Sequence, residues 1–341
     1  IHKLGAVDVP VYPTLTAKQI EFIFNDANVK YAIVSNSFQL NKVKKVIGEV
    51  KSLKKVIVIS DKGVELEKNI LSYNQVCQNG SDLHQKQPDY NNKIKAKINP
   101  SNLLTIIYTS GTTGNPKGVM LTHSNLVSNI KATSQIVTIS ETDVFLSFLP
   151  LCHSFERMAG YYTAFACGAT IAYAESVETV RDNLAEVKPT IMTSVPRLFE
   201  RIYNRIHRQV EDGPPLKKKI FNWALSTGRK YVIAKKHGFI SPALAIKHRL
   251  ADKLVFNKLK TATGGRIRYF VSGGAALGRE YGEFFEAVGL QIIEGYGLTE
   301  TSPIITGNRL DDYKFGSVGK PLPGVEVKIA EDGEILARGP N

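Results

Sequence analysis

The chain contains the run Tyr108-Thr109-Ser110-Gly111-Thr112-Thr113-Gly114-Asn115-Pro116-Lys117-Gly118, directly after the apolar segment 103–108. Short hydroxyl-bearing residues and glycines leave backbone N–H groups accessible, and a concave loop of this kind suits phosphate oxygens. Lys117 adds a cation near the end of the run. The run therefore predicts a phosphate-binding loop after a buried strand of an α/β fold.

The spacing of this run differs from that of a Walker A loop. Pro116 stands where that motif has its second glycine, and Gly118 follows the lysine where Ser or Thr is required. A loop rich in Gly, Thr and Ser could also be an ordinary flexible turn without a ligand. The rest of the chain decides between these interpretations.

The whole run resembles the phosphate-loop signature of the adenylate-forming superfamily, which includes acyl-CoA synthetases, luciferases and the adenylation domains of peptide synthetases. Every fixed position of the pattern Tyr-Thr-Ser-Gly-[Ser/Thr]-[Thr/Ser]-Gly-x-Pro-Lys-Gly is matched. The resemblance implies a catalytic role for Lys117 and a part in a Mg²⁺ site for Thr109. It implies ATP-phosphate contacts for Thr109, Ser110, Gly111, Thr112, Thr113, Gly114, Asn115, Pro116 and Lys117.

Further motifs follow in the order of that family. Pro150-Leu151-Cys152-His153-Ser154-Phe155 resembles the segment that lines the acyl pocket, and Ser272-Gly273-Gly274-Ala275-Ala276 resembles the loop against which adenine rests. Glu294-Gly295-Tyr296-Gly297-Leu298-Thr299-Glu300-Thr301 resembles the Tyr-Gly-x-Thr-Glu motif, and 316–321 the turn after it. Together with Gly5 to Pro13, the resemblance covers nearly the whole chain.

The residue types of the Tyr-Gly-x-Thr-Glu motif suit a nucleotide. Tyr296 offers an aromatic face to adenine, Thr299 a hydroxyl to the α-phosphate, and Glu300 a hard oxygen ligand to Mg²⁺. Glycines let the backbone approach a flat base or ribose. Without the other motifs, Tyr296 would suggest a packed core aromatic and Glu300 a solvated carboxylate. The resemblance implies nucleotide contacts for Gly273, Gly274, Ala275, Glu294, Gly295, Tyr296, Gly297 and Thr299.

His153 requires its own interpretation. The resemblance implies that it lies beside the substrate carboxylate and gates a pocket formed with Ser154, Phe155 and Gly297. A histidine after a strand end could also be a hydrogen-bonded polar residue at a rim. We do not expect it to act as a general base, because a carboxylate nucleophile is already deprotonated at neutral pH.

The resemblance implies ATP-dependent activation of a long-chain fatty acid to acyl-AMP and then to acyl-CoA, with Mg²⁺ as cofactor and CoA as co-substrate. Two features resemble the long-chain branch of the family. One is a basic insertion, Pro214 to Thr263, and the other is the amino-acid sequence of Pro196 to Ile202 and of Phe270 to Ala275. One alternative is an acyl- or aryl-AMP ligase that loads a carrier protein. Another is a non-catalytic module that binds membranes. Chain-length preference and oligomeric state stay open.

The net charge of +13 is concentrated in one region. Between Pro214 and Arg268 there are fourteen Lys and Arg and one acid, Asp252, so the rest of the chain is balanced. Such a patch favours an anionic partner, namely phospholipid headgroups, a polyphosphate ligand or nucleic acid, although a solvated helical face would have the same composition. No aromatic ladder or zinc-ligand pattern accompanies it, which disfavours nucleic acid.

The expected location is the cytoplasm, with peripheral contact at the inner face of a membrane. Cys77, Cys152 and Cys167 have no disulfide or metal-ligand spacing. The longest apolar stretch, Tyr161 to Ala174, is well short of the ~20 residues that a spanning helix needs.

The hydrophobic pattern predicts an α/β fold of layered sheets and helices. Strands are expected at 31–35, 56–59, 103–108, 144–149, 191–193, 267–271 and 290–293, and helices at 17–25 and 279–288. Ser194 is the expected cap of a helix with Pro196 in its first turn. The polar stretch Asn79 to Pro100 is expected to be irregular. Val325, Val327 and Ile329 alternate with polar residues before a turn, which predicts a hairpin with 334–338.

The expected organisation is one large adenylate-forming domain over 1–341. Its subdomains are an α/β part (1–100), an α/β part with the ATP motifs and a basic helical insertion at 214–263 (101–310), and the start of a β-rich part (311–341). Complete family members continue into a Thr-Gly-Asp segment, a hinge and a lid with a catalytic lysine. We therefore interpret the chain as an N-terminal fragment that is inactive alone in the full reaction.

Overall fold

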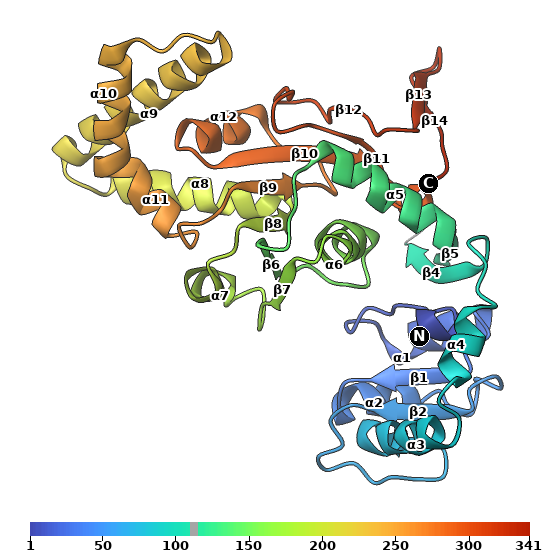
Figure 1. Cartoon of the computed structure of the whole chain (residues 1–341). Coiled ribbons are helices and arrows are strands. Elements are labelled where there is room, and N and C mark those ends of the chain that lie inside the picture. Colours follow the sequence, from blue (N-terminus) through green and yellow to red (C-terminus); the bar gives the residue numbers. More distant parts are fainter. Residues whose placement is uncertain (110–114) are drawn as a thin grey trace. The chain divides into compact units, whose positions relative to one another are not determined.

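The computed structural model describes residues 1–109 and 115–341, which form two compact units, Ile1–Ser124 and Asn125–Asn341 (Figure 1). The first unit contains a parallel sheet in the order β1-β2-β3, formed by Tyr31–Val34, Lys55–Val58 and Ile70–Ser72. β-Branched residues supply its centre, where Val56 and Val58 are fully buried. Its helices are α1 (Ala17–Asp26), α2 (Ser37–Lys44), α3 (Tyr73–Lys86) and α4 (Tyr90–Lys95), after a 3₁₀ turn at His2–Leu4.

Helix α1 starts where the sequence predicted. Thr16 and Gln19 form a capping box, in which the Gln19 side chain accepts a hydrogen bond of 2.9 Å from the Thr16 N–H. The expectation that Asn79 to Pro100 is irregular was wrong, because much of it lies in α3 and α4. Neither helix buries a single residue, and both are rich in polar side chains, so the polar composition of the stretch did not indicate helices.

The second unit is built on a seven-stranded sheet in the order β12-β11-β10-β9-β8-β6-β7. The five strands from β10 to β7 are parallel, whereas β11 and β12 are added antiparallel at one edge. In chain order these strands are Val144–Ser147, Thr170–Tyr173, Ile191–Ser194, Tyr269–Ser272, Gln291–Gly297, Ile304–Gly307 and Lys320–Pro321. The carboxyl ends of the parallel strands all lie at the same end of the sheet, and α/β folds bind ligands at this carboxyl end.

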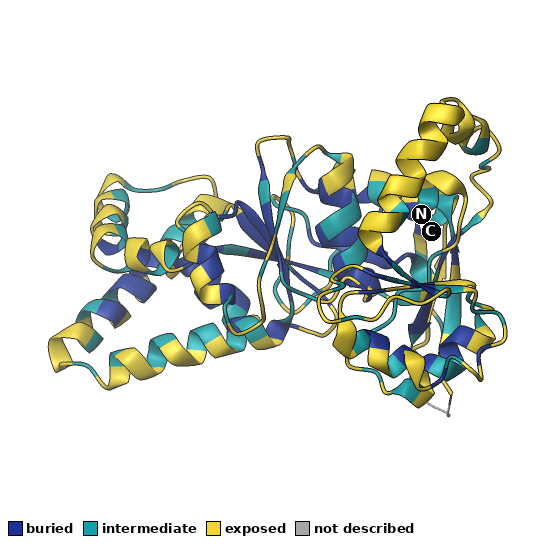
Figure 2. Ribbon diagram, turned by 90° about the horizontal axis from the view of Figure 1, so that it is seen from below, coloured by how far each residue is buried: buried dark blue, intermediate teal, exposed yellow. Residues whose placement is uncertain are grey.

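Alternation along the parallel strands builds a core on each face of this sheet. Leu146, Met192, Phe270 and Ile292 pack with α7 (Val180–Val187), α8 (Pro196–Glu211), α9 (Pro215–Lys236) and α12 (Arg279–Ala287). The neighbouring residues Phe145, Ile191, Tyr269 and Ile293 pack with the opposite layer, α5 (His123–Ile136) and α6 (Thr163–Ala166). Both faces are therefore covered, and Figure 2 shows the central strands as buried.

The basic region is helical, as predicted. It comprises α9, α10 (Pro242–Ala251), a π-helical turn at Asp252–Phe256 and α11 (Asn257–Thr261). Helix α9 crosses α12 closely, because a Cβ at Gly228 would lie 2.2 Å from the Ala287 carbonyl oxygen. The predicted hairpin is formed by β13 (Glu326–Ile329) and β14 (Ile335–Arg338).

Ser194 is not the cap of α8, contrary to the sequence prediction. It is the last residue of β8 and is fully buried, while Val195 occupies the cap position without a side-chain hydrogen bond. The strand expected at 290–293 also continues farther, through Gly297. Part of the Tyr-Gly-x-Thr-Glu motif is therefore strand rather than loop.

Candidate functional site

The predicted phosphate loop connects two antiparallel strands of the first unit, β4 (Leu103–Thr109) and β5 (Lys117–Thr122). Tyr108 pairs with Gly118, and Thr109 with Lys117. The predicted positions from Ser110 to Gly114 lie outside the described residues. Asn115 and Lys117 are exposed, and the Lys117 ammonium group forms no ion pair with the part of the chain that the structure describes.

The strand pair around this loop is closely packed. A Cβ at Gly118 would lie 2.8 Å from Ile106 Cγ2 and 3.0 Å from Tyr108 Cζ, so a side chain at this position would push its neighbours apart. The Tyr108 hydroxyl donates a hydrogen bond of 2.5 Å to Asp26 Oδ2 in α1. Burial, together with the nearby Asp26 carboxylate, raises the pKa of Tyr108. This hydrogen bond links the strand that leads into the loop, β4, to helix α1.

In the second unit, β10 carries the glycines of the Tyr-Gly-x-Thr-Glu motif. A Cβ at Gly297 would lie only 1.7 Å from the Pro303 carbonyl oxygen, so no other residue fits there. The register of the pairing with β11 shifts between Tyr296 and Gly297, where it skips Ile305 of β11. Tyr296 is half-buried at this irregular end of the strand pair.

The Glu294 side chain lies in the protein interior and forms a hydrogen bond there. Its side chain is buried, and Oε2 accepts a hydrogen bond of 3.3 Å from the Leu277 N–H. Burial raises the pKa of Glu294, while the backbone N–H groups of Leu277 and Gly316 act in the opposite direction. The carboxyl group therefore ties the loop after β9 to β10, and any nucleotide contact at this position falls to the backbone.

A hydrogen bond joins two of the predicted motifs. Thr299 and Glu300 lie in a 3₁₀ turn, Thr299–Thr301, directly after β10. Thr299 Oγ1 lies 3.0 Å from Oγ of Ser154, which is buried. The segment expected to line the acyl pocket and the motif expected to hold the α-phosphate therefore meet, although 145 positions separate them.

A third motif joins them through Phe155. A Cβ at Gly273 would lie 2.8 Å from Phe155 Cε2, so the ring packs directly against the backbone of the predicted adenine loop. Gly274, with φ +80°, and Ala275 are exposed at this loop. Three segments that are distant in sequence thus converge at the carboxyl edge of the parallel strands, within the second unit.

His153 presents a neutral imidazole at this edge. Loss of hydration by burial lowers its pKa, although part of the residue remains exposed to solvent. Its Nδ1 accepts a hydrogen bond of 3.2 Å from the Phe155 N–H, which leaves the proton on Nε2. The ring can therefore donate one hydrogen bond from Nε2 at neutral pH.

The sequence interpretation missed a buried acid next to these residues. Glu156 is fully buried at the start of a π-helical segment, Glu156–Tyr162. Ser147 in β6 donates a hydrogen bond of 2.5 Å to Oε1, and Thr193 in β8 donates one to Oε2. Gly160 leaves room for the carboxyl group, because a Cβ there would lie 2.6 Å from Oε1. Burial raises the pKa of Glu156 to about 7. Little in the sequence indicated this burial, because Arg157 follows Glu156 directly and an acid beside a base usually lies on the surface.

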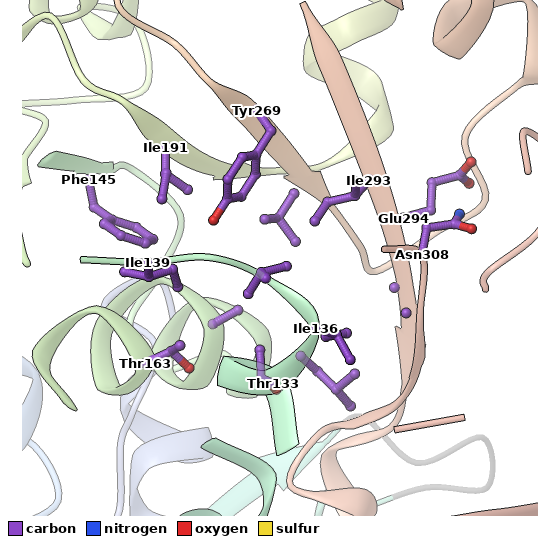
Figure 3. A pocket seen from close by; sticks show the side chains of 16 residues that line it. Thr133, Ile136, Ile139, Phe145, Thr163, Ile191, Tyr269, Ile293, Glu294 and Asn308 are labelled. Atoms are coloured by element: carbon purple, nitrogen blue, oxygen red, sulfur yellow. The ribbon is translucent and has the colours of Figure 1, made fainter. Parts of the chain in front are cut away.

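An apolar cavity of about 40 Å³ lies between the sheet and α5 (Figure 3). Phe145, Ile191, Tyr269 and Ile293 line it from the strands, and Ile136 from the helix. It has room for a few water-sized groups but not for an extended acyl chain. A chain that entered here would need the surrounding side chains to move.

Mg²⁺ fits the described residues only as an ion shared with a ligand. Within residues 1–109 and 115–341, no group of three His, Cys, Asp or Glu side chains is placed to hold a metal ion. Glu300 is exposed and forms no ion pair with those residues, so its oxygens are free to bind. Mg²⁺ commonly uses one or two carboxylates plus substrate phosphates, and Glu300 meets that requirement.

Curated proteins are similar to this chain over nearly its whole length. Long-chain-fatty-acid–CoA ligase FadD15 of Mycobacterium tuberculosis is 35% identical over 341 residues, which is 99% of this chain and 55% of the relative. Peroxisomal long chain acyl-CoA synthetase 6 of Arabidopsis thaliana is 35% identical over 98% of this chain and 48% of the relative. The chain thus spans about half the length of these relatives.

Solved structures show the same fold. An anthranilate CoA ligase, AuaEII, in complex with anthranoyl-AMP superposes with a TM-score of 0.65 at 20% identity over 98% of this chain and 54% of that one. The N-terminal domain of FACL13 from Mycobacterium tuberculosis gives 0.64 at 17% identity over 99% and 71%. The family described as AMP-binding enzyme matches residues 1–341. The chain belongs to this family of AMP-binding enzymes.

Proposed function

We propose that this chain is the ATP-binding part of a long-chain-fatty-acid–CoA ligase that forms acyl-AMP and then acyl-CoA. The observation that carries the proposal is the convergence of three predicted motifs. Ser154 bonds Thr299 at 3.0 Å, and Phe155 packs against Gly273. The similarity to long-chain ligases supports the choice of acid.

In the first half-reaction, the fatty carboxylate attacks the α-phosphorus of ATP, and pyrophosphate leaves as the mixed anhydride bond of the acyl adenylate forms. The Ser154 hydroxyl orients Thr299, which would hold an α-phosphate oxygen. The loop that ends at Lys117 would bind the β- and γ-phosphates. Mg²⁺, when bound through Glu300, offsets the charge that develops on the phosphate oxygens.

His153 would act by position in this scheme. Its lowered pKa keeps the imidazole neutral, and the Nε2–H can donate to a carboxylate oxygen of the acid. A donor here would hold the nucleophile in line without taking a proton from it. In the second half-reaction, the CoA thiolate attacks the acyl carbon and AMP leaves.

An acid panel in ATP–pyrophosphate exchange tests the proposal on the full-length protein. We expect exchange with long-chain fatty acids and, once CoA is added, release of free acyl-CoA. Exchange only with aryl acids, or transfer only to a carrier protein, would favour the alternative ligase. Vesicle binding without any nucleotide affinity would support the non-catalytic alternative and overturn the proposal.

The place of action is part of the proposal. No helix of the described residues is long and apolar enough to cross a membrane. We propose a cytoplasmic enzyme that contacts the inner face of an anionic membrane through its basic region, where it would collect its substrate. Each Lys or Arg close to such a surface is worth about 1 kcal/mol, so a few contacts give reversible binding.

A further inference from the structure

A second, polar cavity of about 340 Å³ lies between α9 and α10, within the basic region. Trp223, Ser226, Thr227 and Lys230 line it from α9 at the spacing i, i+3, i+4 and i+7, which places them on one stripe of that helix. Ser241 and Lys247 are among the residues that line it from α10. No acidic side chain is among the described residues that form this cavity, which we name the α9–α10 pocket.

The two lysines of the pocket carry uncompensated charge. Within the ranges 1–109 and 115–341, neither Lys230 nor Lys247 forms an ion pair. The single acid of the basic region, Asp252, already binds Lys260 at 2.6 Å. A pocket with two cations and no carboxylate attracts an anion, and the potential is strongest where both cations face one cavity.

The hydroxyl groups of the pocket differ in their availability. Thr227 donates its proton to the Trp223 carbonyl oxygen at 2.8 Å and is therefore occupied. Ser241 accepts from the Leu244 N–H at 3.3 Å, which leaves its own proton free to donate. The Ser226 hydroxyl forms no side-chain hydrogen bond within the part of the chain that the structure describes. Two donors of O–H type thus accompany two ammonium groups, a set that matches the oxygens of a phosphate.

Large apolar side chains are exposed on α10 and in the α9–α10 connection, close in sequence to the residues that line the pocket. Ile246 precedes Lys247 on α10 and is 67% exposed, and Leu250, one turn farther on, is 49% exposed. Phe239, in the connection between the two helices, is 74% exposed. Figure 2 shows much of this helical pair, on the left, as exposed. Apolar side chains interspersed with Lys are typical of a surface that lies in the interface of a bilayer.

We propose that the α9–α10 pocket binds the phosphomonoester headgroup of phosphatidic acid, while Phe239, Ile246 and Leu250 enter the bilayer interface. A phosphomonoester carries close to two negative charges at neutral pH, which matches Lys230 and Lys247, whereas a phosphodiester carries one. The exposed apolar side chains favour the lipid over a free phosphate. The proposal rests on the proposed membrane contact, and it does not depend on the ligase chemistry.

The test uses the full-length protein and vesicles of phosphatidylcholine mixed with either phosphatidic acid or phosphatidylglycerol at equal surface charge. We expect the wild type to bind the phosphatidic acid vesicles more tightly, on the order of tenfold. The double variant Lys230→Gln with Lys247→Gln should bind both vesicles equally. The matched control, Lys219→Gln with Lys258→Gln, removes the same charge from exposed lysines outside the pocket and should keep the preference.

Other outcomes separate the possible failures. Equal binding of the two vesicles by the wild type would overturn the headgroup site and leave the general membrane contact standing. Absence of binding to any vesicle would reject both, and the exchange assay would still report on the ligase. Lysine-dependent binding of glycerol phosphate without a vesicle preference would identify a site for soluble phosphates instead. Circular dichroism should show that both double variants are folded.

Discussion

Replacing Glu156 by Gln should change how stability depends on pH. The pKa of this carboxyl rises from its ordinary 4.5 to about 7 in the folded protein, because it is fully buried. The folded state therefore holds the proton more tightly than the unfolded state does. Stability contributed by the protonated acid is complete below pH 4.5, and it is lost as the pH rises towards 7.

The difference between these pKa values corresponds to about 3 kcal/mol, which is the cost of keeping Glu156 ionised and buried above pH 7. Gln is nearly isosteric and always neutral, and the hydroxyl groups of Ser147 and Thr193 can each rotate to accept or donate. The variant should therefore avoid this cost. At pH 8 it should be more stable than the wild type, and near pH 5 the advantage should have largely disappeared.

Thermal unfolding of both proteins across this pH range measures the effect, because other titrating groups are common to both and cancel. A stability difference that does not change with pH would refute the reasoning. Glu156→Ala is the contrasting variant. It leaves the two hydroxyl groups without their partner and opens a cavity, so it should destabilise the protein by about 2–4 kcal/mol near pH 5. At pH 8 this loss should be largely offset, because Ala also avoids the cost of about 3 kcal/mol that the ionised, buried carboxylate imposes on the wild type.

Three further predictions concern the site. Gly297→Ala should lower the melting temperature and abolish pyrophosphate exchange, because the new methyl group would lie 1.7 Å from a backbone oxygen. The control Gly48→Ala, where no atom lies within 4 Å of the new methyl group, should be neutral in both assays. Ser154→Ala removes the 3.0 Å hydrogen bond to Thr299, so it should slow pyrophosphate exchange about tenfold and lower the free energy of unfolding by only about 1 kcal/mol. A large loss of stability with normal exchange would contradict the positioning role of Ser154. Glu300→Ala should remove the Mg²⁺ dependence of ATP binding in calorimetry, and an unchanged dependence would exclude Glu300 from the metal site.

Local patterns accounted for the elements whose sequence alternates regularly or forms an apolar run. Alternating residues in Val325 to Ile329 predicted the β13–β14 hairpin, and the apolar segment before the phosphate loop predicted β4. Two features were not predicted correctly from the sequence. Helices α3 and α4 are rich in polar residues and bury no residue, so little apolar sequence marked them as helices. Ser194 has the composition of a cap but ends a buried strand, because tertiary packing outweighed a local preference.

The order of the motifs along the chain led us to predict which segments form the candidate site, but it did not predict the contacts between their side chains. The Ser154–Thr299 hydrogen bond and the binding of Thr193 to Glu156 join residues far apart in sequence, so only the folded sheet reveals them. The α9–α10 pocket depends in the same way on two helices lying side by side. Charge counting indicated a basic surface there, but it could not show that two lysines share one cavity.

The turn between β10 and β11 has a consequence for the thermodynamics of ligand binding. It is held at both ends by strand pairing, and the Leu298 N–H bonds the Pro303 carbonyl oxygen at 3.1 Å across it. The side chain of Asn129 also donates to the Ile304 carbonyl oxygen at 2.7 Å and accepts from its N–H at 3.2 Å. The backbone that carries Thr299 and Glu300 is thus ordered before any ligand arrives, so little conformational entropy is lost there on association. Its amide protons should exchange with deuterium as slowly in the free protein as in a complex.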